Sequence, residues 1–348
     1  MADYKNILII KPSAMGDIIT ALPALHALRS AYPNARITWL VRPEFAALLK
    51  NHPELNDIII FDRKGMGKWF RDVISFRMLG EFKRKLRNAK FDLVVDLQGL
   101  FRSGYFAWIT GARTRVGLAK SRELARLFYT KTIPWDKSVV HVVDYYLRLA
   151  SEITGVKAQA EFVFADDSAA RMSAFDKLAE GSVDRNNYCV LIPGSAHARK
   201  NWPADNFAQL ADKINAKFGF DIVTVGSASE KPITQAVATA AKYKIYDLAG
   251  RTSIPELTAL LQNAKMVVSN DTGPGQMAAA MPVPVVLIFG PSNPIRIHPY
   301  GRGENIVAKN PWSRGYAIHN LDPIYNIECI AVDEVFDKVC EIYNKERK

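Results

Sequence analysis

The feature that most constrains the fold is a regular alternation of short apolar runs with segments of helical periodicity. In the first part of the chain, "NILII" at 6–10 precedes a helical segment at 18–32. "ARITWLV" then precedes "EFAALLKN", and "FDLVVDLQG" precedes "FRSGYFAWIT". Apolar strands that alternate with helices are typical of parallel sheets covered by helices on both faces. The sequence therefore predicts an α/β fold built from doubly wound parallel sheets.

A second series of the same kind follows a polar stretch. Residues 157–187 contain "ADDS" and "EGSVDRNN" and lack a clear apolar period, so we assign the interdomain region to them. Strands and helices alternate again from Tyr188 to "PVVLIFG". A chain of 348 residues is too long for one comfortable core. We therefore predict two Rossmann-like domains, 1–165 and 186–330, and a C-terminal helix at 331–348.

The composition is typical of a globular protein in a reducing compartment. Hydrophobic residues make up 49% of the chain and charged residues 23%, which is too apolar for disorder. "MADYKNILII" lacks the pattern of a signal peptide, and "MAAAMPVPVVLIFG" is too short to cross a bilayer. Cys189, Cys329 and Cys340 are widely spaced without a metal-ligand pattern. We expect a cytoplasmic protein with no transmembrane segment.

The formal net charge of +11 predicts an anionic partner. In the segment 63–90, which we call the basic arm, ten Lys and Arg residues stand against Asp72 and Glu81. Charge alone leaves nucleic acid, an anionic membrane surface and a phosphorylated substrate open as partners. No nucleic-acid recognition motif accompanies the charge, so we expect no nucleic acid. Apolar residues interrupt the basic arm at Trp69, Phe70, Ile74, Phe76, Met78 and Leu79.

The sequence lacks the motifs of several kinds of catalytic site. No strand is followed by "GxGxxG", and no "GxxxxGK[ST]" is present, so the dinucleotide fingerprint and the P-loop are both missing. Neither HExxH nor CxxC occurs. We expect neither a cofactor nor a metal.

Two turns between a strand and a helix carry the chemistry. In "KPSAMGDIIT" the carboxylate of Asp17 occupies a place where backbone amides usually favour a phosphate. Asp17 either caps its helix or belongs to a site for something other than phosphate. In "VVSNDTGPGQ" a strand ends at Asp271, and Thr272 and Gly273 open a helix of small residues. The amides of this second turn can approach a diphosphate, or the glycines serve only tight packing.

Four motifs together resemble the lipopolysaccharide heptosyltransferases. They are "KPSAMGD", "DLQGLFRSG", "PGSAHARKNWP", and "NDTGP" followed by "FGPSNP". The resemblance implies a GT-B fold, in which two Rossmann-like domains face each other across a cleft. It implies inverting transfer of heptose from ADP-heptose to the Kdo and lipid A inner core, at the cytoplasmic face of the inner membrane. The form "SAMGD" is most similar to the heptosyltransferases that add the first heptose to Kdo.

The same resemblance assigns roles to individual residues. Asp17 corresponds to the general base, which removes a proton from the acceptor hydroxyl. Its competing interpretation is an N-cap of the helix that starts at Ile18. The donor-binding residues implied are Ser195, Lys200, Glu230, Asp271, Thr272, Gly273 and Gln276. The alternatives are a solvated loop lysine for Lys200 and a first-turn glutamate for Glu230.

Gln276 departs from the family pattern, because relatives often carry a histidine there. Glutamine donates hydrogen bonds but carries no titratable proton. This departure counts against an acid role at Gln276, and a different donor sugar is the alternative.

On the acceptor side, arginines and a serine at the ends of N-terminal elements are candidates for an acidic sugar such as Kdo. These are Arg102, Ser103, Arg113 and Arg115, with Gly16 of the first turn; surface ion pairs are the competing interpretation for the arginines. The basic arm is expected to meet anionic lipid, or else to be a solvated helix. His141 and His298 are interpreted as structural. A non-enzymatic nucleotide- or anion-binding protein remains the alternative to an enzyme.

Overall fold

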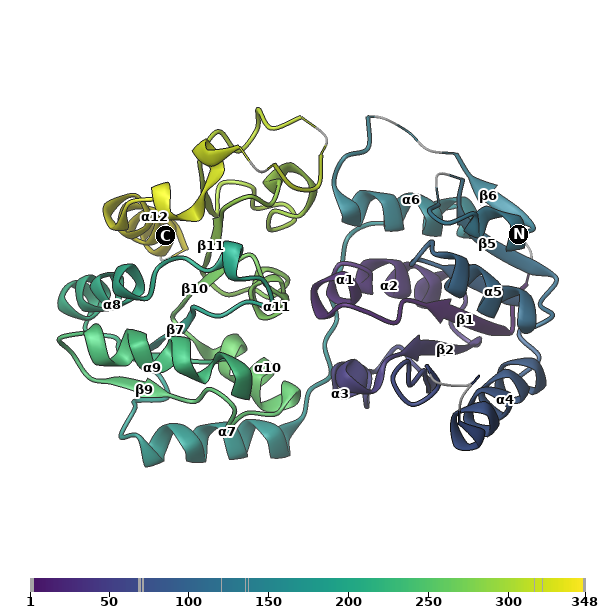
Figure 1. Ribbon diagram of the computed structural model, residues 1–348, viewed down its shortest axis with the longest axis horizontal. Helices are drawn as coiled ribbons and strands as arrows, with labels where there is room; N and C mark the ends of the chain where they lie inside the picture. The colour runs from purple at the N-terminus through teal and green to yellow at the C-terminus, as the bar shows by residue number, and fades with distance from the viewer. Residues whose placement is uncertain are drawn as a thin grey trace. The chain divides into compact units, whose positions relative to one another are not determined.

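The computed structural model describes residues 3–67, 70, 72–119, 121–134, 136, 138–315, 317–320 and 322–346. Of the basic arm, Lys68, Trp69 and Arg71 lie outside these residues. The chain divides into two compact units, Met1–Asp166 and Asp167–Lys348. Figure 1 shows strands enclosed by helices in each unit. We describe the N-terminal and C-terminal units separately.

In the described part of the N-terminal unit, six parallel strands form one sheet in the order β3-β2-β1-β4-β5-β6. The central strands β1 and β4 pair with Ile7 opposite Leu93. The strands are β1 (Asn6–Ile10), β2 (Arg36–Val41), β3 (Asp57–Ile60), β4 (Leu93–Asp96), β5 (Thr114–Leu118) and β6 (Lys131–Ile133). The helices are α1 (Met15–Ile19), α2 (Leu22–Ala31), α3 (Ala46–Leu49), α4 (Val73–Asn88), α5 (Phe101–Ile109) and α6 (Val142–Thr154).

Two helical layers bury both faces of this sheet. Leu8 and Ile10 of β1 belong to a core cluster with Phe82 of α4 and Phe106 of α5. The alternate side chains of β1 are also fully buried and point to the opposite face, because side chains alternate along a strand. On that second layer α2 packs against α6. The near-continuous apolar run of β1 therefore reflects a parallel strand buried on both sides.

The C-terminal unit repeats this topology in its described residues, with six parallel strands in the order β12-β11-β10-β7-β8-β9. The strands are β7 (Tyr188–Ile192), β8 (Asp221–Thr224), β9 (Ile245–Asp247), β10 (Met266–Asn270), β11 (Val285–Phe289) and β12 (Ile306–Ala308). The helices are α7 (Ser168–Glu180), α8 (Ala204–Phe218), α9 (Lys231–Ala240), α10 (Ile254–Asn263), α11 (Gly273–Ala279) and α12 (Val332–Glu346). Both sheets thus have the Rossmann-type strand order.

One local expectation was wrong, and the region assigned between the domains contains a helix that the sequence did not predict. The helix predicted at 18–32 is two helices, α1 and α2, because Pro23 lacks an N–H and starts a new helix in its first turn. Residues 168–180, assigned to the interdomain region, form α7, whose Ser173 and Lys177 side chains bind Glu256 of α10. Only Ala174 and Leu178 of α7 are buried, which explains the weak apolar period.

The C-terminal helix α12 packs within the C-terminal unit. Val335, Val339 and Ile342 join the core cluster that contains Phe207 of α8. Among the described residues, no helix is both long and apolar enough to span a bilayer.

Candidate active site

In the N-terminal unit, the loops after β1 and β4 leave the same edge of the sheet. These neighbouring strands lie where the order of connections reverses, and ligands of doubly wound sheets bind at this point. The ammonium of Lys11, directly after β1, donates to the carbonyl of Leu97, directly after β4, at 3.3 Å. The same edge carries α1, which begins at Met15.

Asp17 lies in the first turn of α1. Because the helix begins at Met15, Asp17 is its third residue, so the competing interpretation as the N-cap of a helix that starts at Ile18 is wrong. The backbone amide of Ala14 donates to Asp17 Oδ2 at 3.0 Å, and Lys11 Nζ lies 3.8 Å from Asp17 Oδ1. The Asp17 side chain is 50% exposed. A carboxylate held at both oxygens and open to solvent is suited to accept a proton from a bound hydroxyl.

Lys11 is buried beneath Asp17 in a network of charged and aromatic groups. Its ammonium lies 5.4 Å from the centre of the Tyr146 ring. Burial works to lower the pKa of Lys11, but Tyr146, Asp17 and Asp96 outweigh it, and the pKa is raised. Burial raises the pKa of the Asp96 carboxyl, against hydrogen bonds from Tyr129 and from the backbone. Lys11 therefore stays a cation.

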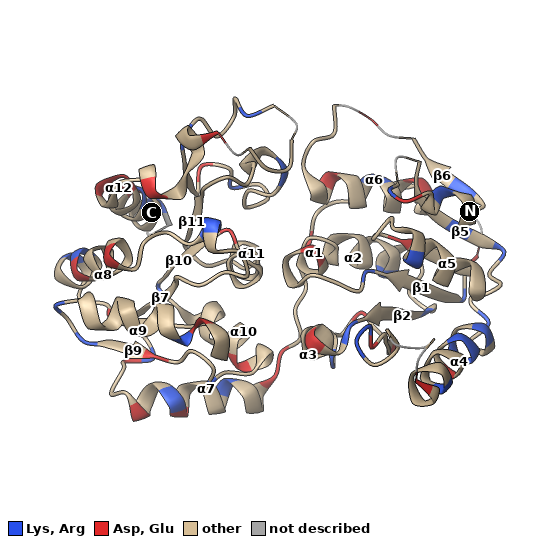
Figure 2. Cartoon of the chain, viewed as in Figure 1, with Lys and Arg blue, Asp and Glu red and all other residues tan. Residues whose placement is uncertain are grey.

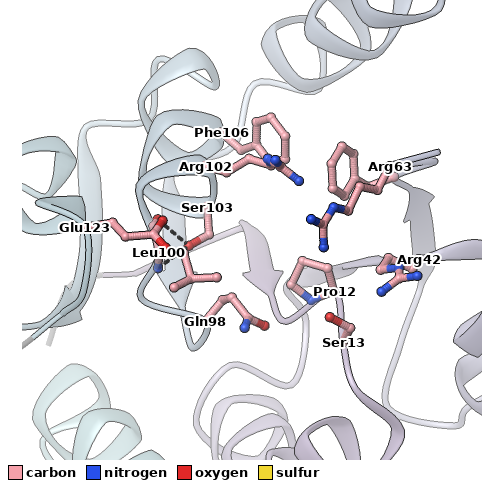
Figure 3. Close-up of a pocket in the computed structure, with 11 residues that line it drawn as sticks. Pro12, Ser13, Arg42, Arg63, Gln98, Leu100, Arg102, Ser103, Phe106 and Glu123 are labelled. Carbon is pink, nitrogen blue, oxygen red and sulfur yellow. Dashed lines mark hydrogen bonds between the residues drawn. The ribbon is translucent and has the colours of Figure 1, made fainter. Parts of the chain in front are cut away.

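A pocket of about 170 Å³ opens beside this turn. Three arginines line it, Arg42, Arg63 and Arg102, each from the region after a different strand or at the start of α5. Figure 3 shows Arg63 and Arg102 pointing toward one another, with Gln98 on the opposite side. The remaining lining residues are Pro12, Ser13, Phe61, Leu100, Ser103, Phe106 and Glu123. Three guanidinium groups around a small pocket are suited to an anion.

The electrostatics of the pocket favour a negative ligand. Burial and the neighbouring Arg63 lower the pKa of Arg102, and Glu123 only partly opposes them. The positive charges of Arg63 and Arg102 repel each other, and an anion between them would relieve the repulsion. Nε of Arg42 is buried, and among the described residues it has no hydrogen-bond partner. The side-chain oxygen of Gln98 is likewise buried and has no hydrogen-bond partner among the described residues.

The expected acceptor residues fall into two groups. Arg102 and Ser103 line the pocket, although the buried Ser103 hydroxyl also binds the backbone of Leu100 and so fixes the start of α5. Gly16 lies in α1 beside Asp17. Arg113 and Arg115 lie at the start of β5, the opposite end of the strand. The Arg115 guanidinium donates to the carbonyls of Ala112 and Phe128, which is a structural role.

In the C-terminal unit, the corresponding edge joins the loops after β7 and β10. Lys200 Nζ lies 2.7 Å from Asp271 Oδ2, and both side chains are largely buried. The side-chain nitrogen of Asn270 donates to the carbonyl of Pro193 at 2.7 Å. The side-chain oxygen of Asn270 accepts from the backbone amide of Trp202. These contacts fix the two loops against each other at the reversal of strand connections.

A second cavity, of about 550 Å³, lies beside Lys200. Its lining is basic: His197, Arg199, Lys200 and His319, together with Ala198 and Pro291. Burial and the nearby charge of Lys200 lower the pKa of His319, against the attraction of Asp271. This cavity has the charge expected of a site for phosphates.

The turn from β10 into α11 is organised by Thr272, whose hydroxyl accepts from the amide of Gly275. A β-carbon at Gly275 would lie 2.6 Å from the hydroxyl of Ser269, so only glycine fits. Gly273 is the first residue of α11. The buried amide of Gln276 donates to Asp271 Oδ1 at 3.3 Å and to the carbonyl of Ile297 at 2.8 Å. Gln276 therefore helps to hold the Asp271 carboxylate in place.

Glu230 packs on the loop after β7. A β-carbon at Gly194 would lie 2.7 Å from the Glu230 carboxyl carbon, so glycine is required there. One carboxylate oxygen of Glu230 accepts from the amide and the hydroxyl of Ser227. The Ser195 hydroxyl forms hydrogen bonds within its own loop, where it donates to the carbonyl of His197 and accepts from the amide of His197. Glu230 is thus placed at the same edge as Lys200, and Ser195 shapes the loop.

Sequence reasoning missed several residues of these sites. Lys11, Arg42, Arg63 and Gln98 follow parallel strands within a few residues. That position is itself a usable signal, because the carboxyl ends of parallel strands share one edge. His319 lies far from the motifs and had no such signal. Among the described residues, no group of three or more His, Cys, Asp or Glu side chains is placed to hold a metal ion.

The two Rossmann-type units define a GT-B fold, and the sequence model of glycosyltransferase family 9 (heptosyltransferase) matches residues 79–318. The chain therefore belongs to glycosyltransferase family 9 and is a glycosyltransferase. The matched residues include Lys200, Glu230 and Asp271, whereas Asp17 lies before them.

Named relatives are similar to this chain over most of their length. The lipopolysaccharide core heptosyltransferase OpsX of Haemophilus influenzae is 27% identical over 310 residues, which is 87% of this chain and 84% of that protein. Lipopolysaccharide heptosyltransferase 1 of Pseudomonas aeruginosa is 28% identical over 308 residues, or 86% of this chain and 82% of the relative. The expected resemblance to the heptosyltransferase family is confirmed.

Solved structures agree with the fold. A family 9 glycosyltransferase from Veillonella parvula aligns with a TM-score of 0.84 and 25% identity, covering 99% of this chain and 98% of the other. The Escherichia coli heptosyltransferase WaaC, solved with ADP, aligns with a TM-score of 0.79 and 25% identity over 97% of this chain and 99% of WaaC. The predicted GT-B fold class is confirmed.

Proposed function

We propose that this enzyme transfers heptose from ADP-heptose to the Kdo and lipid A inner core of lipopolysaccharide, at the cytoplasmic face of the inner membrane. The names of the relatives support heptose transfer in core assembly, and the WaaC structure with ADP supports an ADP-linked donor. In this proposal the N-terminal domain binds the acceptor and the C-terminal domain binds the donor.

The observation that carries the acceptor side is the arginine-lined pocket next to the Asp17 turn. Ser13 lines the pocket, and the next amide in the chain, that of Ala14, holds Asp17. Kdo carries a carboxylate, and lipid A carries phosphates. Arg42, Arg63 and Arg102 can bind such anions by charge-assisted hydrogen bonds. The acceptor would thereby be anchored with a neutral hydroxyl directed at Asp17.

Asp17 then acts as the general base. As the acceptor hydroxyl attacks the anomeric carbon, its proton passes to the half-exposed carboxylate, and the bond from that carbon to the ADP oxygen breaks. A single displacement inverts the anomeric configuration and needs one base. Lys11 orients the carboxylate for this step, because its buried ammonium lies 3.8 Å from Oδ1 of Asp17.

On the donor side, charge accumulates on the diphosphate as the glycosidic bond breaks. Lys200 can stabilise that charge in the transition state more than in the ground state. Its present partner is Asp271, and an ammonium has two further protons to donate. In this proposal Glu230, with one carboxylate oxygen engaged by Ser227, binds the ribose hydroxyls.

A different nucleotide-sugar donor is the second candidate, and Gln276 favours it. Its amide is held by Asp271 and Ile297 and supplies no titratable proton. Thermal unfolding of the protein with ADP, UDP or GDP distinguishes the candidates. ADP-heptose as donor predicts the largest stabilisation with ADP, and a larger effect of UDP or GDP would favour the alternative.

The direct test is incubation of the protein with ADP-heptose and a Kdo-lipid A acceptor, followed by mass spectrometry. A gain of one heptose on the acceptor, together with release of ADP, is the expected result. Absence of a product with this acceptor, when a core oligosaccharide that already carries heptose is modified, would overturn the assignment of the acceptor.

A further inference from the structure

The first turn of α4 presents apolar side chains to solvent. Val73 is 66% exposed, Ile74 69% and Phe76 62%. The turn is nevertheless well fixed, because the Asp72 carboxylate caps it by accepting from the amides of Ile74 and Ser75. Ser75 itself is buried. The helix therefore holds three apolar side chains outward, at a cost in hydration that a partner would recover.

Cations surround this apolar turn. Within α4 there are five Lys or Arg residues against one acid, Glu81, and Figure 2 shows the basic residues along the helix. At 100° per residue, Arg77, Arg84 and Arg87 lie on the same outer side as Val73 and Phe76. Phe82 and Leu86 face the core instead. The outer side of α4 is therefore both apolar and strongly basic.

An aromatic row connects α4 to the neighbouring helix α5. Lys83 Nζ lies 5.4 Å from the centre of the Tyr105 ring, and Tyr105 stacks on Trp108 at 6.0 Å between ring centres. Trp108 is 53% exposed. We call the outer side of α4 together with Trp108 the α4 surface. Tryptophan at the margin of such a surface is typical of contacts with the headgroup region of a bilayer.

We propose that the α4 surface docks on a bilayer of anionic lipids. Its apolar tip can enter the acyl boundary, while the arginines and lysines bind lipid phosphates. The charge complementarity selects an anionic membrane over a neutral one. As a device for reaching a lipid-anchored acceptor, this surface rests on the proposed function, but vesicle binding itself does not require catalysis.

Co-sedimentation of the full-length protein with vesicles tests the proposal. Vesicles of phosphatidylglycerol and phosphatidylethanolamine should bind the protein, and vesicles of phosphatidylcholine should not. Replacement of Arg84, Lys85 and Arg87 by Glu should weaken binding by about tenfold or more, because each basic residue contributes separately. The matched control replaces three exposed cations of the C-terminal unit, Arg185, Lys242 and Lys265, by Glu.

The apolar contribution is tested separately. The double variant Ile74→Glu and Phe76→Glu should lose most of its vesicle binding, including the part that survives high salt. Met172→Glu with Val156→Glu is the control, because these side chains are 68% and 57% exposed elsewhere. Circular dichroism and thermal unfolding establish that each variant is folded.

Three results would overturn the proposal: equal binding to neutral vesicles, α4 variants that bind like their controls, or tighter binding to duplex DNA than to anionic vesicles. Heptose transfer to a water-soluble acceptor without acyl chains is measured as well, because this reaction needs no membrane and so tests the proposed function separately. The α4 variants should retain that transfer. Normal vesicle binding without any transfer would contradict the proposed function and leave the membrane surface standing.

Discussion

The buried ammonium of Lys11 lies 3.8 Å from Oδ1 of Asp17, while the amide of Ala14 holds Oδ2. Lys11 is 4% exposed and Asp17 is half-exposed. The pair therefore has a cation on the protein side and an open carboxylate on the solvent side. A carboxylate oriented in this way can receive a proton from solvent or ligand, and the lysine helps to fix its direction.

Replacement of Lys11 by Met should reduce kcat by roughly 10- to 100-fold, because Asp17 loses the group that orients it. Binding of ADP should be unchanged, since the donor residues lie in the other unit. Steady-state kinetics and calorimetric titration with ADP measure the two effects. Lys5→Met, at an exposed position, is the control. An unchanged kcat in a folded Lys11→Met protein would rule out the role.

Stability at alkaline pH should also depend on Lys11. Despite burial, the pKa of Lys11 is raised above 10.5 by Tyr146, Asp17 and Asp96. The folded state thus holds this proton more tightly than the unfolded state, and the stabilisation is complete below pH 10.5. It is lost as the pH rises through the higher folded pKa.

Urea unfolding at a series of pH values from neutral to strongly alkaline should show this loss. Lys11→Met should show a smaller decrease in unfolding free energy, although buried tyrosines such as Tyr146, whose pKa is raised by burial, still contribute. Equal decreases in the two proteins would mean that Lys11 is not coupled to its neighbours.

Arg102→Met should raise KM for the acceptor by about tenfold or more, the effect of losing a hydrogen bond between charged groups. KM for the donor should stay the same. Arg113→Met provides the matched control, because Arg113 is exposed and lies at the opposite end of the sheet. If both variants raise KM equally, the arginine pocket is not the acceptor site.

Much of the fold could be predicted from the sequence, because buried parallel strands leave a clear pattern. "NILII" and "YCVLI" match β1 and β7 residue for residue. The edge strand β6 and the helix α7 could not be found this way. β6 has three residues, only one of them buried, and α7 buries two side chains, so neither has a usable apolar period.

The candidate site was predictable where a motif is local and not where it depends on tertiary contacts. Asp17, Lys200 and Asp271 came from short motifs, and the last two form an ion pair across 71 residues. Arg42 and Arg63 reach the pocket because β2 and β3 end at the same edge of the sheet, which sequence spacing alone does not show. Arg113 and Arg115 lie at the start of β5, which is the end of the strand opposite to the pocket.

Lys200→Met should lower kcat by about 10²- to 10³-fold, as expected when a group that binds transition-state charge is removed. It also leaves the buried Asp271 without its cation, so the unfolding free energy should fall by about 1–3 kcal/mol. Lys200→Arg keeps the charge and should recover part of both losses. Thermal unfolding and initial rates provide the measurements. A variant with full activity would exclude Lys200 from the donor site.

The most direct test of Asp17 as the base is the rate of heptose transfer by Asp17→Asn, measured together with its affinity for ADP. Asparagine keeps an oxygen that can accept from the Ala14 amide, so the turn should stay intact. The variant should bind ADP like the unmodified protein and transfer heptose about 10²- to 10⁴-fold more slowly. Transfer at the unmodified rate would contradict the assignment of Asp17 as the base.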